Sequence, residues 1–270
     1  MNYPEPRPRW LMRSAIARPG IYWLPNAITT CALFAGFYAI VQAMNLRFEL
    51  AAMGIFVAMV FDGLDGRIAR LTRTQSAFGA EYDSLSDMVA FGAAPALVVY
   101  EWALKGMGKF GWFAAFVYCG CAALRLARFN TNNIGVVDKR FFQGLPSPAA
   151  AGLIAGFVWA MEAYDIPRRD LPWVAWLLAV FAGFTMVSSI RFYSGKDVNL
   201  RKAVPFWVVV MIAFAVVAIV QMADNLPEVL FSLFLVYAAS GYVMWVVQFA
   251  GRRKARQETP PSRQEPGSGL

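Results

Sequence analysis

Four aspartates lie in two closely spaced pairs within largely apolar sequence. Asp62 and Asp65 are three residues apart, and Asp83 and Asp87 are four residues apart. Either spacing places both side chains of a pair on one face of a helix. Because the connection between the two pairs is short, the two helices are expected to be antiparallel neighbours that bring the four carboxylates together.

Carboxylates that gather without histidine or thiolate ligands indicate a site for a hard divalent cation. An aspartate at mid-bilayer costs roughly 2.5–3.5 kcal/mol, and repulsion between like charges adds to this cost. Oxygen ligands suit Mg²⁺, Mn²⁺ or Ca²⁺ rather than zinc or copper. Mg²⁺ and Mn²⁺ are typical of phosphate chemistry.

Two glycines stand among these carboxylates, although glycine in a helix costs about 1 kcal/mol relative to alanine. Gly63 is interpreted as a site of close helix packing, which is common in membranes. Gly66 directly follows Asp65 and is interpreted as a position where a ligand approaches the backbone.

The composition excludes several other kinds of site. The chain has no histidine, so Ser-His and Cys-His nucleophile pairs and histidine-ligated metals are ruled out. Its three cysteines lie inside apolar runs and do not form a disulfide framework or a zinc site. The net charge of +8 comes from short basic segments between apolar runs, so no nucleic-acid partner is expected.

The elements that must position the aspartates are membrane helices. The chain has 270 residues, of which 59% are hydrophobic, and its apolar runs have the length that spans a bilayer. We predict an all-α, polytopic membrane helical bundle. The eight predicted spans are 26–44, 48–71, 83–104, 110–130, 147–163, 172–190, 204–222 and 227–250.

The basic residues predict the orientation of these spans. If both termini are cytoplasmic, all but five of the 25 Lys and Arg residues fall on the inner side, as the positive-inside rule requires. The five outer ones are Arg47, Lys105, Lys109, Arg168 and Arg169. We therefore predict a multi-pass protein of the cytoplasmic (inner) membrane, with the carboxylates at the cytoplasmic face.

The aspartate region resembles the CDP-alcohol phosphatidyltransferase family, whose signature is D-x2-D-G-x2-A-R-x8-G-x3-D-x3-D. Every fixed position is filled, by Asp62, Asp65, Gly66, Ala69, Arg70, Gly79, Asp83 and Asp87. The resemblance implies a six-helix core around a two-metal site that holds Mg²⁺ or Mn²⁺. It also implies that a CDP-linked lipid donates its phosphatidyl group to an alcohol and that CMP leaves.

The resemblance assigns roles to individual residues. Asp62, Asp65 and Asp83 would be metal ligands, and Asp87 would be both a ligand and the catalytic proton acceptor. The nucleotide and lipid of the donor would be held by Asn26, Thr29, Gly66, Arg70, Ser76 and Gly79. The basic residues Arg67 and Arg73 fit interfacial contacts with lipid headgroups at least as well.

A second group of polar residues lies in segments that resemble those of the family members that use serine as the acceptor. These members carry similar R-L-A-R-F-N and G-L-P-x-P-A-A-A segments, which here begin at Arg125 and Gly144. Arg125 and Arg128, three apart on one helical face, can supply a cation for the serine carboxylate, with Asn130 beside them. Both arginines also fit positive-inside anchoring, and the second segment fits either a pocket wall or a helix boundary.

These observations predict an enzyme that uses CDP-diacylglycerol and L-serine within membrane lipid, with no covalent intermediate. The expected organisation is a cytoplasmic segment (1–20), a six-helix core (21–195), two additional C-terminal transmembrane helices (196–250) and a disordered cytoplasmic tail (251–270). A homodimer is compatible with glycine-rich faces in the later spans. Alternatives are transfer to glycerol 3-phosphate, inositol phosphate or choline, a divalent-cation transporter, or an inactive scaffold.

Overall fold

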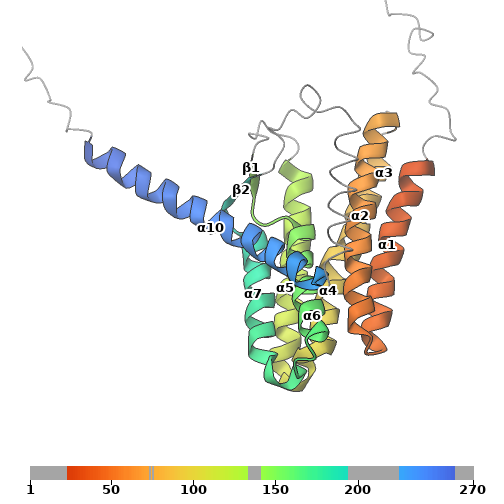
Figure 1. The fold of residues 1–270 in the computed structure, drawn as a ribbon. Coiled ribbons are helices and arrows are strands. Elements are labelled where there is room, and N and C mark those ends of the chain that lie inside the picture. The colour runs from red at the N-terminus through yellow and green to blue at the C-terminus, as the bar shows by residue number, and fades with distance from the viewer. Residues whose placement is uncertain (1–22, 73, 75, 133–140, 194–224, 259–270) are drawn as a thin grey trace, which may run out of the picture.

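The computed structural model describes residues 23–72, 74, 76–132, 141–193 and 225–258. Over these residues the chain is a helical bundle, as predicted, with one small two-stranded ribbon added (Figure 1). The elements are α1 (Trp23–Met44), α2 (Phe48–Thr72), α3 (Ala77–Asp87), η3 (Met88–Ala93), α4 (Ala94–Val99), η4 (Tyr100–Leu104), η5 (Lys105–Met107), α5 (Lys109–Asn132), β1 (Phe141–Gln143), α6 (Ser147–Ala163), η6 (Arg168–Asp170), α7 (Pro172–Val187), β2 (Arg191–Tyr193) and α10 (Leu226–Glu258).

The predicted spans correspond to these helices, except that span 204–222 lies outside the described residues. The elements from α3 to η5 follow one another without a break and form a single long helix, the third helix, over residues 77–107. Among the described helices, four are long and apolar enough to cross a bilayer. They are Trp23–Met44, Ala77–Met107, Lys109–Thr131 and Leu226–Val243, and α6 and α7 are shorter apolar helices.

The bundle has small residues inside and large apolar residues outside. Its buried set is rich in alanine, whereas aromatic side chains such as Phe34, Phe110 and Trp173 are about two-thirds exposed (68%, 68% and 66%). In water such exposure would be unfavourable, but lipid tails solvate these side chains, and small residues let helix backbones approach closely. This distribution is that of a membrane-embedded protein.

Close approach is visible where α1 meets its two neighbours. A Cβ added to Gly36 would lie 2.6 Å from the Cα of Ala90 in the third helix. A Cβ added to Gly54 of α2 would lie 3.1 Å from the carbonyl oxygen of Ala35. These two glycines allow α1 to pack against both helices that carry the aspartates.

The third helix departs from regular α geometry directly after Asp87. Pro95 has no N–H, so it cannot pair with the carbonyl of Phe91 one turn earlier. The buried hydroxyl of Tyr118, on α5, donates to that carbonyl at 3.0 Å. The π-helical turn of η3 covers the same stretch, and π turns of this kind occur often at functional sites.

The strands β1 and β2 pair antiparallel, with Phe142 opposite Phe192. The all-α prediction does not include this ribbon. Gly144 follows β1 with a φ of +78°, and a Cβ there would collide with the carbonyl of Met186. Its N–H donates to the carbonyl of Ile190 at 2.8 Å. Gly144 therefore joins the start of α6 to the end of α7, which favours the helix-boundary interpretation of this segment.

The last helix, α10, crosses α6 obliquely and continues beyond the bundle (Figure 1). It ends at Glu258, so residues 251–258, predicted to be disordered, are helical. The segment is made largely of Arg, Lys, Ala, Gln and Glu, which have high helix propensity and extend a helix that is already nucleated. The rest of the predicted tail, like the predicted segment 1–20, lies outside the described residues.

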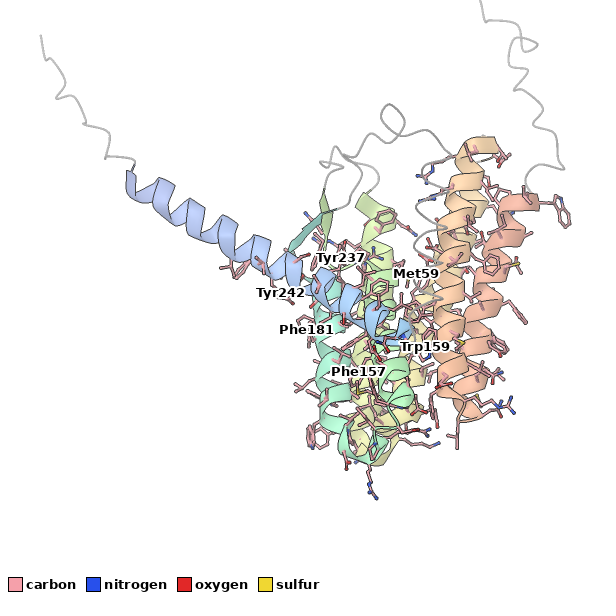
Figure 2. The ribbon with its side chains drawn as sticks, viewed as in Figure 1. Met59, Phe157, Trp159, Phe181, Tyr237 and Tyr242 are labelled. Atoms are coloured by element: carbon pink, nitrogen blue, oxygen red, sulfur yellow. The ribbon has the colours of Figure 1, made fainter. Side chains whose placement is uncertain are left out.

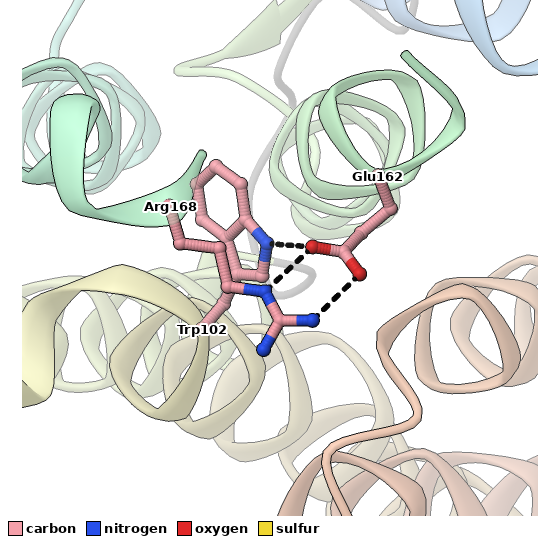
Figure 3. Close-up of polar contacts among 3 residues, drawn as sticks. All are labelled: Trp102, Glu162 and Arg168. Carbon is pink, nitrogen blue, oxygen red and sulfur yellow. Dashed lines mark hydrogen bonds and ion pairs between the residues drawn. The ribbon is translucent and has the colours of Figure 1, made fainter. Parts of the chain in front are cut away.

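At the opposite end of the bundle from the ribbon, three residues, Trp102, Glu162 and Arg168, form the Glu162 clamp (Figure 3). The Trp102 indole and the Arg168 Nε donate to Glu162 Oε1 at 2.7 and 2.8 Å, and Arg168 Nη2 donates to Oε2 at 2.9 Å. The guanidinium also lies 4.4 Å above the ring centroid of Phe48. The clamp thus joins the third helix, α6, η6 and the first residue of α2.

Candidate metal centre

Three of the four predicted carboxylates converge between α2 and the third helix. Asp62, Asp83 and Asp87 each offer an oxygen, and these oxygens lie within 4.8 Å of one another. The carboxyl groups of Asp62 and Asp87 are close enough to share a hydrogen bond. α2 packs against η3 and α4, deeper in the third helix, so the two helices are neighbours, as predicted.

The fourth carboxylate, Asp65, lies beside this group and is tied to α1. Its side chain is buried, and its Oδ2 accepts a hydrogen bond from Thr29 Oγ1 at 2.7 Å. It also contacts Asp83. Thr29 was predicted as a donor-binding residue, and here it orients one of the predicted metal ligands.

The arrangement fits a divalent cation. Metal–oxygen bonds of about 2.0–2.6 Å allow one ion to join oxygens up to about 5 Å apart, which covers the 4.8 Å spread. In addition, Asp83 Oδ1 is buried and has no hydrogen-bond partner among the described residues. At this spacing two carboxylates repel each other by on the order of 3 kcal/mol, so a cation between them stabilises the cluster.

Three of the residues predicted to hold the donor lie together at the start of α3. Ser76 caps this helix, and its Oγ accepts from the N–H of Gly79 at 3.0 Å. A Cβ added to Gly79 would lie 3.1 Å from Ser76 Oγ and 3.5 Å from Asn26 Oδ1. The missing side chain at Gly79 therefore leaves room for α1 and the α3 cap to meet.

The end of α2 is open on the side of the glycines. A Cβ added to Gly66 meets no described atom within 4 Å, as its interpretation as a ligand-access position requires. The same holds for Gly63, so the prediction that Gly63 packs against a helix is wrong for the described residues. Arg70 is exposed in the last turn of α2, without a partner in the described part of the chain.

Arg125 connects the cluster to the neighbouring helices. Its Nη1 donates to the buried Ser147 Oγ at 2.6 Å, and its charge interacts with both Asp87 and Asp62. A guanidinium has five N–H donors, and Ser147 is its one hydrogen-bond partner among the residues described. Arg125 therefore keeps donors for a further anionic group near Asp87.

The other two residues predicted to bind the acceptor have different surroundings. Arg128 donates to Gln143 Oε1 at 2.7 Å and to the carbonyl of Val187 at 3.4 Å, and so it holds the β1 segment. Asn130 donates to Ser84 Oγ at 3.0 Å, which links α5 to the residue next to Asp83. The structure thus brings Arg125, but not Arg128, to the carboxylates.

Sequence reasoning missed the hydroxyl groups that support the cluster. The Ser86 hydroxyl donates to the carbonyl of Thr29 at 3.2 Å, and the hydroxyls of Tyr82 and Thr30 are 2.9 Å apart. These groups fix α3 against α1 at the level of the carboxylates. The signal for them was the run of polar residues from Tyr82 to Asp87 in an otherwise apolar helix.

An apolar groove of about 600 Å³ runs between α1 and α2 beside the cluster. One end is lined by Thr30 and Phe61, which directly follow Thr29 and precede Asp62, and the other end by Tyr38 and Leu50. The groove therefore leads from the carboxylates along the outside of the two helices.

Comparison with known proteins identifies relatives of the chain. Residues 22–188 match the family model of the CDP-alcohol phosphatidyltransferases. This range includes the four aspartates and Arg125, and it ends before α10.

Individual relatives are similar over half of the chain or more. A protein named CDP-diacylglycerol–serine O-phosphatidyltransferase from Helicobacter pylori (strain J99) is 35% identical over 228 residues, 84% of this chain and 92% of its own length. A protein of the same name from Methanocaldococcus jannaschii is 34% identical over 71% of this chain and 82% of its own length. A third, from Mycobacterium tuberculosis (strain H37Rv), is 40% identical over 50% of this chain and 48% of its own length.

Proposed function

The chain belongs to the CDP-alcohol phosphatidyltransferase family, and we propose that it transfers the phosphatidyl group of CDP-diacylglycerol to L-serine, giving phosphatidylserine and CMP. The observation that carries this function is the convergence of Asp62, Asp83 and Asp87 to within 4.8 Å in a chain whose relatives carry the name of that activity. The prediction of an enzyme of this family is confirmed by the family match.

The donor would lie along α1 and α2. The apolar groove beside the cluster fits an acyl chain and brings the diphosphate to the carboxylate end. Open space at Gly66 leaves room for the nucleotide against the backbone, and the exposed Arg70 can offer paired donors to its phosphate oxygens. Asn26, Ser76 and Gly79 would border the same space.

Divalent cations, Mg²⁺ or Mn²⁺ at a two-metal site, would neutralise the diphosphate and stabilise the departing CMP. Asp62, Asp65, Asp83 and Asp87 would hold them, with Asp65 fixed by Thr29.

Asp87 would take the proton of the serine hydroxyl as that oxygen attacks the phosphatidyl phosphorus. The new phosphorus–oxygen bond forms while the bond to CMP breaks, so no covalent enzyme intermediate is required. A donor chiral at phosphorus would then react with inversion, and retention would contradict direct attack.

Arg125 would receive the serine carboxylate. In serine the hydroxyl oxygen and the carboxylate carbon are separated by only three bonds, so the groups that bind them must be neighbours. The charges of Arg125 and Asp87 interact electrostatically, which supports this requirement. Arg128 and Asn130 would support the acceptor site indirectly, because Arg128 holds the β1 segment and Asn130 links α5 to Ser84.

The protein is embedded in a membrane, and the finer topology is part of the proposal. We place both termini and the carboxylates on the cytoplasmic side, where the positive-inside rule puts most of the basic residues. The predicted six-helix core, the two further helices and a homodimer belong to the same proposal.

The experiment that tests the function uses purified full-length protein in detergent micelles containing CDP-diacylglycerol. CMP release is measured with Mg²⁺, with Mn²⁺ and with a chelator, for L-serine, glycerol 3-phosphate, inositol phosphate and choline. We expect release with L-serine that requires a divalent cation. Asp87→Asn should abolish it, whereas Glu81→Gln, an exposed carboxylate on the same helix, should not.

Other outcomes select the alternatives. CMP release with another alcohol but none with L-serine would reassign the acceptor. Divalent-cation flux in liposomes without CMP release would favour a transporter, since carboxylates within helices also line ion paths.

A further inference from the structure

Two hydrogen bonds join α5 to the third helix. The Tyr118 hydroxyl donates to the carbonyl of Phe91 at 3.0 Å, and the Asn130 amide donates to Ser84 Oγ at 3.0 Å. The later residue of α5 is paired with the earlier residue of the third helix, so the two helices are antiparallel. The segment of α5 between the two bonds therefore runs beside the segment of the third helix between them.

Arg125 lies between these bonds on α5, and Asp87 lies between them on the third helix. Arg125 follows Tyr118 by seven residues, which is almost two full helical turns, so both side chains leave α5 on the same face. Tyr118 reaches the third helix from this face, and Arg125 therefore faces the third helix near the level of Asp87. The electrostatic interaction of Arg125 with Asp87 and Asp62 agrees with this placement.

The guanidinium of Arg125 is held by the first residue of α6. Its Nη1 donates to Ser147 Oγ at 2.6 Å, and Ser147 is fully buried. A serine hydroxyl carries no charge, so this bond orients the guanidinium without neutralising it. None of the ion pairs in the described part of the chain includes Arg125, so its charge remains available to an anionic ligand.

The segment that leads to Ser147 is fixed to the end of α7. The N–H of Gly144 donates to the carbonyl of Ile190 at 2.8 Å, and the N–H of Leu145 donates to the carbonyl of Thr185 at 3.0 Å. Ser147 occupies the one unspecified position of the G-L-P-x-P-A-A-A segment. Its hydroxyl is therefore a feature of this chain that the segment pattern does not require.

The rest of α6 is a rigid support for its first residue. The ring centroid of Phe157 lies 5.4 Å from that of Trp102 in the third helix and 5.6 Å from that of Phe231 in α10. Figure 2 shows Phe157 and Trp159 close to the crossing of α6 and α10. Most residues of α6 are buried, and close packing of this kind leaves a helix little freedom to shift. The Ser147 hydroxyl therefore has a fixed position.

The hydrogen bond to Ser147 leaves one edge of the guanidinium free. A guanidinium is planar, and its five N–H donors have a fixed arrangement. With Nη1 held by Ser147, Nη2 and Nε form an edge that has no hydrogen-bond partner among the residues the structure describes. Such an edge binds a carboxylate through two parallel hydrogen bonds, and the bond to Ser147 sets the direction in which the edge points.

We infer that Ser147 is a positioning residue for the acceptor, whose hydroxyl holds the free edge of the Arg125 guanidinium toward the carboxylate of serine. The inference rests on the proposed function. It assigns part of the selectivity for a carboxylate-bearing alcohol to the first residue of α6. Ser147 does not touch the reacting atoms, so its effect falls on acceptor binding rather than on the chemical step.

The test replaces Ser147 by alanine, which removes the hydroxyl and keeps the Cβ. Initial rates of CMP release are measured on the full-length protein with Mn²⁺, varying L-serine, serinamide and CDP-diacylglycerol in turn. Serinamide keeps the hydroxyl and the amine but lacks the carboxylate. For Ser147→Ala we expect the KM for L-serine to rise about fivefold, the scale of one lost hydrogen bond, with kcat and the KM for CDP-diacylglycerol unchanged. The preference for L-serine over serinamide, measured as the ratio of their kcat/KM values, should shrink by the same factor.

A second variant and a matched control accompany this substitution. Ser147→Cys keeps the space filled but offers only a weak acceptor, so it should shift the KM for L-serine and the preference over serinamide in the same direction by a smaller factor. The control is Ser240→Ala, which makes the same change at an exposed serine of α10 whose Oγ donates to the carbonyl of Tyr237 at 2.7 Å. It should leave both quantities at their wild-type values.

The inference is overturned if the Ser147 variants leave both quantities unchanged. It is also overturned if the KM for CDP-diacylglycerol rises by the same factor, or if Ser240→Ala gives the same shifts, because the effect would then be structural. If the wild-type protein releases no CMP with L-serine, the proposed function itself fails, and that result is seen before any variant is compared.

Discussion

Asp83 has a buried carboxylate oxygen without a hydrogen-bond partner among the described residues, beside three other carboxylates. This arrangement of carboxylates destabilises the metal-free protein and becomes favourable once the carboxylates share a cation. The cluster should therefore be less stable without metal than with it, because a ligand that binds only the folded state stabilises that state.

We expect Asp83→Asn to remove most of the dependence of the free energy of unfolding on bound metal. In the wild-type protein, Mn²⁺ at 100 times its Kd should raise the free energy of unfolding by about 2.7 kcal/mol. In the variant this gain should be largely lost, while stability in chelator should equal or exceed that of the wild type because one repulsive charge is gone. Thermal unfolding in detergent with Mn²⁺ and with chelator measures both effects. Glu81→Gln is the control, and an identical Mn²⁺ response in Asp83→Asn would contradict the assignment.

A substitution at Gly66 distinguishes a role in donor binding from a role in helix packing. A Cβ there meets nothing among the described residues, so Gly66→Ala should leave the unfolding midpoint unchanged or slightly higher, since alanine favours helix by about 1 kcal/mol. If the donor lies against this backbone, the KM for CDP-diacylglycerol should rise several-fold. Gly120→Ala on α5 is the matched control, because its position is equally open. Equal kinetic constants for both variants and wild type would remove Gly66 from the donor site.

At the residue scale, the sequence predicted the ligands better than their supports. Carboxylate spacing of three and four is visible in the sequence, because helix periodicity alone puts such pairs on one face. The Thr29 bond to Asp65 and the Ser147 bond to Arg125 join helices far apart in the chain, and no local pattern encodes such a pairing.

At the element scale, the third helix depends on a bond from another helix. Pro95 leaves the carbonyl of Phe91 without its α-helical donor, and this carbonyl accepts a hydrogen bond from the Tyr118 hydroxyl instead. Phe91 lies one turn from Asp87. Losing the donor leaves a buried acceptor unsatisfied, which costs about 1–3 kcal/mol.

Tyr118→Phe should therefore lower the free energy of unfolding by about that amount. Thermal or denaturant unfolding of the purified variant measures it. Tyr100→Phe is the control for ring substitution, because Tyr100 lies in the third helix, is half-buried whereas Tyr118 is fully buried, and makes no hydrogen bond to a described residue. A loss of the same size in both variants would mean that the cost comes from ring substitution and not from the Phe91 carbonyl.

The sequence predicted where the spans lie, but not their internal geometry. Span length and apolarity follow from bilayer thickness, so the predicted ranges agree with the described helices. The π turn, the ribbon and the direction of α10 arise from tertiary contacts such as Tyr118 with Phe91 and Gly152 with Phe234. Residue propensities carry no information on these contacts.

At the scale of the whole molecule, the Glu162 clamp joins elements at the end opposite the ribbon (Figure 3). Glu162 is its centre, with a side chain only 16% exposed and three donated hydrogen bonds. Glu162→Gln should lower the free energy of unfolding by about 1–2 kcal/mol. This is less than for a fully buried pair, because Arg168 is 40% exposed and solvent screens its charge.

The matched control for this prediction is Asp170→Asn. The pair that Asp170 forms with Arg169 is 3.9 Å long and both side chains are largely exposed, 63% and 86%, so its loss should leave the unfolding midpoint unchanged. If Glu162→Gln proves as neutral as Asp170→Asn, the clamp does not stabilise the bundle.

The length of α10 exceeds what an upright crossing of the membrane requires. Its 33 residues extend about 50 Å at 1.5 Å per residue, whereas the hydrocarbon layer is about 30 Å thick. A helix that crosses this layer upright uses about 20 residues, so α10 has residues to spare for one headgroup region. The stretch from Arg252 to Glu258, which has four cationic residues, would then reach the level of the lipid phosphates. Anionic phospholipid, the chemical class of both the proposed donor and the proposed product, would therefore be concentrated around the end of this helix.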